Sequence, residues 1–266
     1  MNKNCFLLLA LLLVCFSCSK VSQQQSAKVS YCSPDSMVNI SAEIQTFDNN
    51  PVLNDSILEF IEQNFRGFKD YYASSGDAQD AFAKAGEGLW KTLKSEIAEV
   101  RAGMEADNDE ELPDHLFAWE YQDELTVEDI TDKYVTYINS GYEYQGGAHG
   151  MSWAVGTTFN RATGKIVTGA VLKDTESAGF QTLLREGLEK HFENEDGEAM
   201  ALSDILFSDP DEEPIPVGNI RFTKGTVVIQ YQQYEIAPYA FGMPGAVLTF
   251  DQVKPYLTAE GLQLIE

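Results

Sequence analysis

Two short segments carry the side chains that could do chemistry on a ligand. In residues 144–150, His149 follows two glycines and precedes a third. Glycines permit positive φ and a close approach of the backbone, so this loop could present an imidazole to a ligand. In residues 234–239, Glu235 lies between two tyrosines that could form a polar aromatic rim for a saccharide or a peptide. The alternatives are a tight turn whose histidine bonds to local backbone, and a loop anchored by half-buried tyrosines.

Catalytic motifs are scarce. Glu235 and Asp174 are the carboxylate pair considered for a glycan hydrolase, which requires a separation of about 5–10 Å. The three histidines, His115, His149 and His191, are never three or four residues apart, so helical metal-ligand spacing is absent. The chain has no Gly-x-Ser-x-Gly motif and no phosphate-binding glycine loop. We therefore predict no catalytic residue, no metal and no cofactor, and we favour recognition over catalysis.

The elements that must position these segments are predicted from hydrophobic periodicity. Alternating apolar residues predict a strand at residues 38–45, and Asn50-Pro51 predicts the start of a helix. A second helix is expected from about Asp77, and Asp174-Thr175 is expected to cap a third. Further strands are predicted at residues 116–121, 134–138, 151–159, 166–167, 220–222, 227–231 and 246–250. Because few β-α-β crossovers are expected, the pattern indicates an α+β fold, with antiparallel sheets packed with three main helices in two subdomains.

The N-terminal residues have the pattern of an export signal. Lys3 precedes an apolar run, residues 5–16, which is shorter than the roughly 20 residues that span a bilayer but fits a signal peptide. Ser17-Cys18 then resembles the lipobox of a bacterial lipoprotein. We predict a signal peptide at residues 1–17, a diacylglyceryl and palmitate-type lipid anchor on Cys18, and a polar tether at residues 18–36. The alternative is an ordinary signal peptide that is cut elsewhere.

Charge restricts the partners of the chain. It contains 42 acidic and 18 basic residues, for a formal net charge of −24. Such a surface repels phosphate backbones, so nucleic acid is excluded as an expected partner. It attracts cationic partners, although the acidity could also serve only to keep an exported protein soluble. No acidic cluster follows Cys18, which favours an anchor that faces the periplasm.

Several segments together resemble a known family. They are Tyr142–Gly150, Phe159-Asn160-x-x-Thr163-Gly164-Lys165, Leu172-Lys173-Asp174, Phe222–Gly225 and Tyr234–Ala240. This series resembles the extracellular domain of the RsiV anti-sigma factor and of PdaC-type proteins. The C-terminal similarity covers residues 115–257 and is to the DUF3298 family, and a strand followed by an Asn-rich helix start within residues 38–105 is similar to the DUF4163 family. We therefore predict a DUF4163-like part at residues 37–110 and a DUF3298-like part at residues 111–266, with the acidic segment 105–114 at the boundary.

The resemblance implies a non-catalytic recognition module. In RsiV-like proteins this domain senses lysozyme, a small basic enzyme. The first hypothesis is a periplasm-facing cell-envelope lipoprotein that binds a lysozyme-like protein or a peptidoglycan fragment. Its predicted site residues are His149, Tyr144, Tyr234, Glu235 and Tyr239. The alternatives are an envelope glycan hydrolase or a deacetylase-associated module, and a structural partner in an envelope complex. The chain departs from the family layouts because a sigma-binding segment and a polysaccharide-deacetylase motif are both missing.

Overall fold

The computed structural model describes residues 24–108, 112–193 and 200–266. The predicted signal peptide, Cys18 and the first part of the predicted tether lie outside these residues. The chain divides into two compact units, one of Met1–Thr126 with Ser140–Ser152 and one of Val127–Asn139 with Trp153–Glu266. The boundary predicted at residues 110 and 111 concerns sequence families and stays a prediction. Within the described residues, none of the helices has the length and hydrophobicity needed to cross a membrane.

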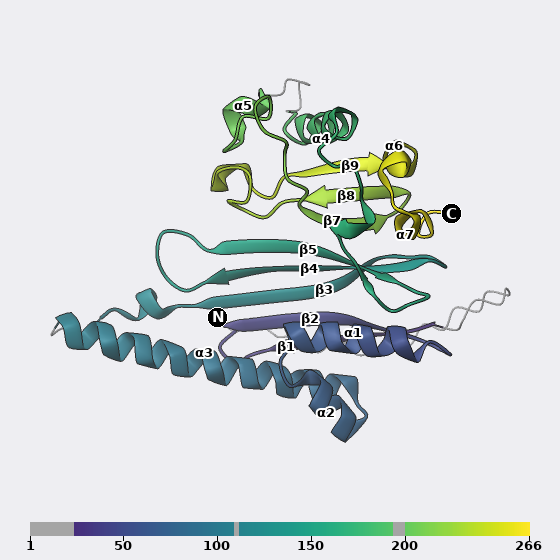
Figure 1. Ribbon diagram of the computed structural model, residues 1–266. Coiled ribbons are helices and arrows are strands. Elements are labelled where there is room, and N and C mark those ends of the chain that lie inside the picture. Colours follow the sequence, from purple (N-terminus) through teal and green to yellow (C-terminus); the bar gives the residue numbers. More distant parts are fainter. Residues whose placement is uncertain (1–23, 109–111, 194–199) are drawn as a thin grey trace. The chain divides into compact units, whose positions relative to one another are not determined.

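The predicted α+β fold with two subdomains is confirmed (Figure 1). One sheet has the strand order β1-β2-β3-β4-β5-β6 and the other has the order β7-β8-β9. The strands of the larger sheet are β1 Gln24–Cys32, β2 Val38–Phe47, β3 Glu120–Ile130, β4 Tyr134–Tyr144, β5 Met151–Asn160 and β6 Ile166–Val167. The strands of the smaller sheet are β7 Asn219–Thr223, β8 Thr226–Gln230 and β9 Gly245–Thr249.

Three helices of the first unit connect β2 to β3. They are α1 Pro51–Asn64, α2 Phe68–Ser75 and α3 Ala78–Asn108. Helix α1 begins as predicted, because the side chain of Asn50 accepts a hydrogen bond from the Leu53 N–H and Pro51 occupies the first turn. Helix α1 packs on β2, and α3 lies along β1 and β2 (Figure 1). These three helices form the long crossover that a parallel strand pair requires.

The first unit differs from the sequence predictions in three details. Strand β2 pairs with β3 in parallel, from Val38 with Tyr121 to Ala42 with Leu125, so this part of the sheet is not antiparallel. Residues 24–32, predicted as tether, form β1, an edge strand that pairs antiparallel with β2. Its sequence is mostly polar because only Val29 is buried, so no apolar alternation reveals it. The strand predicted at 116–121 starts late, because Asp114–Phe117 is a 3-10 helix, η1, that follows Pro113.

The second unit has α4, Ala178–His191, as its long helix, packed on β9 (Figure 1). Its cap is Ser177 rather than Asp174-Thr175, since Asp174 adopts a positive φ of 54° and forms a turn before the helix. The predicted turn between β7 and β8 is present, and positive φ at both Lys224 and Gly225 suits a tight hairpin. The short elements are α5 Leu202–Ile205, α6 Phe250–Val253, α7 Ala259–Leu262, and the 3-10 helices η2 Gly169–Val171, η3 Tyr239–Phe241 and η4 Lys254–Tyr256.

Buried threonines join β4 and β5 to the smaller sheet within the second unit. The Thr136 hydroxyl donates to the carbonyl of Phe222 at 2.6 Å, and the Thr158 hydroxyl accepts from the Phe222 N–H at 3.0 Å. The two hydroxyls are 2.8 Å apart. These bonds satisfy backbone groups that would otherwise be buried without partners. They fix β7, and with it the hairpin that leads to the predicted tyrosine segment.

Candidate functional site

The connection between β8 and β9 carries three of the predicted site residues, and it is fastened to β5. The side-chain amide of Gln232 accepts from the Ala154 N–H at 3.2 Å and donates to the Ala154 carbonyl at 2.8 Å. A backbone strand would make the same pair of bonds, so Gln232 acts here as a substitute for a neighbouring strand. The preceding residue, Tyr231, is buried and donates its hydroxyl to Pro216 at 2.7 Å. Burial raises the pKa of Tyr231, so this anchoring hydroxyl stays protonated.

Glu235 closes the turn in which it lies. Its carboxylate oxygen Oε2 accepts from the Gln232 N–H at 2.7 Å, and its own N–H donates to the Gln232 carbonyl at 3.1 Å. Between these two residues the backbone of Tyr234 has a φ of 65°. A bulky residue in this left-handed region costs about 1–2 kcal/mol and persists where its surroundings hold it. The turn is therefore a strained conformation held by Gln232 and Glu235.

This turn displays a pair of tyrosine rings. Tyr234 is 49% exposed, and its ring centroid lies 5.6 Å from that of Tyr239 at an interplanar angle of 35°. Tyr239 is half-buried and begins η3 directly after Pro238. The rings present an apolar face with hydroxyls at one end, a combination suited to binding a ligand that is partly polar. We call Tyr234 and Tyr239 the tyrosine pair.

A third aromatic residue borders the connection, and sequence analysis missed it. Phe207 is 59% exposed, and its N–H donates to the Ile236 carbonyl at 2.9 Å. It follows α5 at the end of the apolar run Ile205-Leu206-Phe207, and the run does not reveal which of these side chains is exposed. Its exposure marks it as a candidate contact residue, and only the structure shows that exposure. Large exposed apolar side chains next to a polar rim are typical of binding surfaces.

The loop of the first unit that contains His149 is held by its own backbone. The Tyr144 hydroxyl donates to the Gly147 carbonyl at 3.1 Å, and His149 Nδ1 lies 3.0 Å from the Gly150 carbonyl. Gly147 has a φ of 98°, and a Cβ on buried Gly150 would lie 2.4 Å from the Tyr142 ring. Glycine is therefore required at both positions. His149 is exposed at the tip of a constrained turn.

The predicted site residues form two groups. Tyr144 and His149 share one loop of the first unit, and Tyr234, Glu235 and Tyr239 share one connection of the second unit. A joint site of the two groups stays a prediction. The pairing of Glu235 with Asp174 also stays a prediction. In the part of the chain that the structure describes, no group of three His, Cys, Asp or Glu side chains is arranged to hold a metal ion.

The segment that contains the β8–β9 connection and the smaller sheet matches the sequence profile of a known family. Residues 172–251 match the profile described as "Protein of unknown function (DUF3298)". This segment is a DUF3298 domain. It contains α4, β7 to β9 and the tyrosine pair, whereas the loop with His149 lies outside it. The family description assigns no function, and the similarity to RsiV and PdaC proteins and to DUF4163 stays a prediction. No curated protein matches the chain.

Two solved structures share the fold. A DUF3298 family member from Bacteroides fragilis is 17% identical, with a TM-score of 0.67 over 91% of this chain and 96% of that chain. A DUF3298 family protein from Pseudomonas aeruginosa is 16% identical, with a TM-score of 0.50 over 91% of this chain and 96% of that one. At these identities the similarity extends to the fold alone. It covers much more of the chain than the DUF3298 domain does.

Proposed function

We propose that this chain is a non-catalytic recognition module of the cell envelope. It is anchored through a lipid on Cys18, faces the periplasm, and binds a lysozyme-like protein or a peptidoglycan fragment. The observation that carries the proposal is the tyrosine pair, displayed on a strained turn of the DUF3298 domain. Tyrosines supply a large and rigid contact area at low entropic cost, which is why binding surfaces are rich in them.

Recognition is favoured over hydrolysis because the candidate acids and bases have structural tasks. A general acid or base must reach the proton that it transfers in the substrate. The Glu235 carboxylate accepts a backbone hydrogen bond from Gln232, and His149 Nδ1 lies against the Gly150 carbonyl. Both groups support the conformation of their own turn. Tyr234, in contrast, leaves 49% of its surface exposed.

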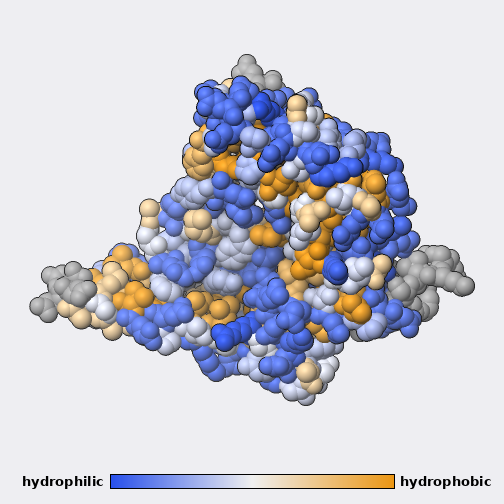
Figure 2. Space-filling view, in the orientation of Figure 1, coloured by the Kyte–Doolittle hydropathy of each residue, from blue (hydrophilic) through white to orange (hydrophobic). Residues whose placement is uncertain are grey.

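Charge supports a basic protein as the first ligand to test. The chain carries a formal net charge of −24, and hydrophilic residues cover most of the face shown in Figure 2. Complementary charge speeds association and suppresses wrong partners, and both effects weaken as salt is added. Peptidoglycan fragments remain the second ligand class, since aromatic rings also suit sugar surfaces.

The proposal is tested by measuring binding of the purified full-length protein to hen egg-white lysozyme and to soluble peptidoglycan fragments. Tyr239→Ala should weaken binding of the true ligand about tenfold, as expected for an aromatic contact residue near the centre of an interface. Tyr71→Ala is the matched control, because Tyr71 is a 37% exposed tyrosine of α2 outside the DUF3298 domain. If neither ligand binds, or if both variants bind like the wild type, the tyrosine pair is not a recognition site.

A structural role in an envelope complex is the second candidate, and the end of α3 favours it. Val100, Met104 and Leu116 are 42%, 43% and 41% exposed, and Figure 2 shows apolar residues gathered around this end. Arg101 links the segments, with its Nη2 2.6 Å from Asp114 Oδ1. Gathered apolar groups on a surface are typical of protein interfaces. Met104→Glu should remove a cross-linked partner from cells that express the protein, and an unchanged cross-linking pattern would exclude this role.

A further inference from the structure

The first strand of the larger sheet has a free edge. β1 lies at the end of the strand order and pairs with β2, so one side of its backbone faces away from the sheet. The Gln79 side chain shows which groups face that way, because its Oε1 accepts from the Ser30 N–H at 3.2 Å and its Nε2 donates to the Ser30 carbonyl at 2.8 Å. The direction of these groups alternates along an antiparallel strand, so the backbone groups of Gln24, Ser26 and Lys28 face the same way as those of Ser30.

This edge is open over the first five residues of the strand. Residues 24–28 are all exposed, and in the part of the chain that the structure describes nothing hydrogen-bonds to their outward backbone groups. Helix α3 reaches the edge at Ser30 through Gln79, and it continues past Tyr31 toward Asp35 in the turn after β1. The helix therefore runs away from residues 24–28 and leaves them uncovered.

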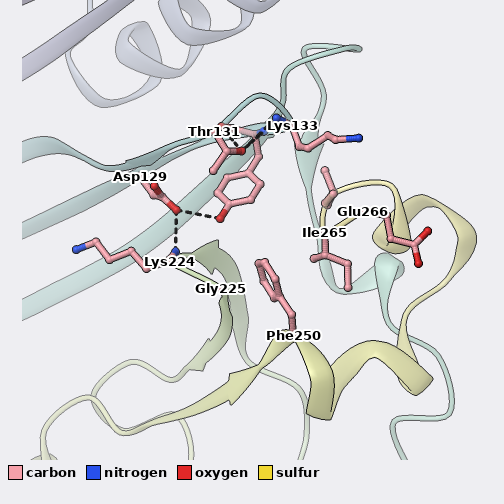
Figure 3. Close-up of a pocket in the computed structure, with 10 residues that line it drawn as sticks. Asp129, Thr131, Lys133, Lys224, Gly225, Phe250, Ile265 and Glu266 are labelled. Atoms are coloured by element: carbon pink, nitrogen blue, oxygen red, sulfur yellow. Dashed lines mark hydrogen bonds between the residues drawn. The ribbon is translucent and has the colours of Figure 1, made fainter.

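Elsewhere, side chains close comparable openings in the backbone. In the second unit, Gln232 bonds to both backbone groups of Ala154 on β5. At the β7–β8 turn, the Asp129 carboxylate accepts from the Lys224 N–H at 2.7 Å, as Figure 3 shows. Among the described residues, no side chain does the same for residues 24–28. The β1 edge is therefore able to add an extended strand, which is a common way for a sheet to bind another chain.

The charge of this edge suits a second copy of the same chain. The formal net charge is −24, yet residues 1–34 contain no Asp or Glu. Lys28 of β1 forms an ion pair with Glu43 of β2, so its charge is balanced within each copy. Two copies that repel each other over most of their surfaces can therefore approach along β1.

We propose that two copies of this chain pair through β1 in an antiparallel arrangement. Because the Gln79 cap ends the open edge, the part that can pair is residues 24–28, and its centre is Ser26. Ser26 then faces Ser26 of the second copy, and Gln24 of each copy faces Lys28 of the other. Each facing pair exchanges two backbone hydrogen bonds, and no like charges face each other. The twofold axis at Ser26 closes the pair as a dimer, and the short interface makes this dimer weak.

Disulfide cross-linking of the purified full-length protein tests the register. All four native cysteines are first replaced by alanine, so the result does not depend on the proposed lipid anchor. Ser26→Cys should then form a covalent dimer under mild oxidation, because the facing Cα atoms are about 5.5 Å apart, a distance that a disulfide spans. Ser30→Cys is the matched control on the same exposed strand. It should not cross-link, because four residues separate this position from the axis in each copy and place the two thiols about 27 Å apart.

Analytical ultracentrifugation tests the backbone hydrogen bonds. The wild type should form a reversible dimer that becomes tighter as salt screens the repulsion between the two copies. Ser26→Pro removes an outward N–H, which an edge strand tolerates, and should weaken dimerisation about tenfold. Ser26→Thr keeps this N–H and should dimerise like the wild type, while thermal unfolding checks that both variants are folded.

Three results would overturn the pairing of two copies. They are a wild type that stays monomeric at all concentrations, equal cross-linking of Ser26→Cys and Ser30→Cys, and a Ser26→Pro variant that dimerises like the wild type. A monomeric wild type would leave the edge open to a strand of a different protein. The dimer is independent of the proposed recognition function, since Tyr239→Ala should leave dimerisation unchanged.

Discussion

At the scale of single residues, Tyr234 combines a backbone conformation that favours glycine with a bulky side chain. Its φ of 65° suits glycine or asparagine, yet the residue is a tyrosine whose ring is half exposed beside Tyr239. The ring is not needed to fill a core. Under the proposed function the Tyr234 ring contacts the ligand, and the strained backbone is the local cost of that placement.

The strained backbone predicts an inverted order of stability for two substitutions. Tyr234→Gly should be more stable than Tyr234→Ala by about 1 kcal/mol, because glycine adopts positive φ without steric cost. At Tyr239, which lies in the 3-10 helix η3, the order should be the usual one, with alanine more stable than glycine. Urea denaturation of the four variants measures both differences. If alanine is the more stable residue at both positions, Tyr234 is not strained.

Residue types and spacing led to the prediction of a site in the tyrosine segment, but they did not predict its conformation. The hydrogen bond that the Gln232 N–H donates to the Glu235 carboxylate depends on the positive φ of Tyr234. No sequence pattern predicts that φ. The attachment of Gln232 to Ala154 joins residues 78 positions apart. Phe207 was missed for the same reason, because its place beside Ile236 arises from tertiary structure.

At the scale of elements, Asp35 joins the β1–β2 hairpin to α3 within the first unit. Its carboxylate accepts from Ser33 at 2.7 Å, from Trp90 Nε1 at 3.1 Å and from Lys94 at 3.3 Å. Partial burial acts to raise the pKa of Asp35, but these bonds and one from the Met37 N–H outweigh it and hold the pKa at about 2. The ionised carboxylate is therefore a clamp between a hairpin and a helix.

Asp35→Asn should destabilise the protein at neutral pH by about 1 kcal/mol, the usual net worth of a hydrogen bond to a partly exposed group. The folded-state pKa lies below the ordinary value of 3.8, so the carboxylate contributes fully above pH 5 and progressively less as the pH falls toward 2. The stability difference between wild type and variant should shrink over this range in urea denaturation. Asp55→Asn, on the exposed face of α1, is the control. A difference that does not change with pH would contradict the clamp.

Elements with strong local signals could be predicted, and those shaped by neighbours could not. Helix α1 was expected from Asn50-Pro51, and α4 from its apolar face, although the cap of α4 lies at Ser177. Helix α2 was missed because it is short. It lies between two glycines of positive φ, Gly67 before it and Gly76 after it. The parallel pairing of β2 with β3 was also not predicted, because the relative direction of two strands depends on the connection between them rather than on the sequence of either strand.

At the scale of the whole molecule, the acidic composition offers a way to test the proposed contact with a partner outside the chain. The net charge of −24 should make binding of a basic protein strongly dependent on salt. Binding of a peptidoglycan fragment should depend on salt much less, because the tyrosine pair contacts it through apolar surface. Titrations at low and high sodium chloride therefore distinguish the two ligand classes even before any variant is made.

The anchoring of the molecule is tested with the two cysteines outside the predicted signal peptide. Cells that express the wild type and are fed a labelled palmitate should incorporate label into the protein, and Cys18→Ala should abolish incorporation and release the protein from the membrane fraction. Cys32→Ala is the matched control, because Cys32 ends β1 inside the folded first unit, where a lipid-transferring enzyme has no signal to act on. Label that persists in Cys18→Ala, or a wild type without label, would mean that Cys18 is not the site of a lipid anchor. A membrane-bound but unlabelled protein would favour a bound partner as the anchor.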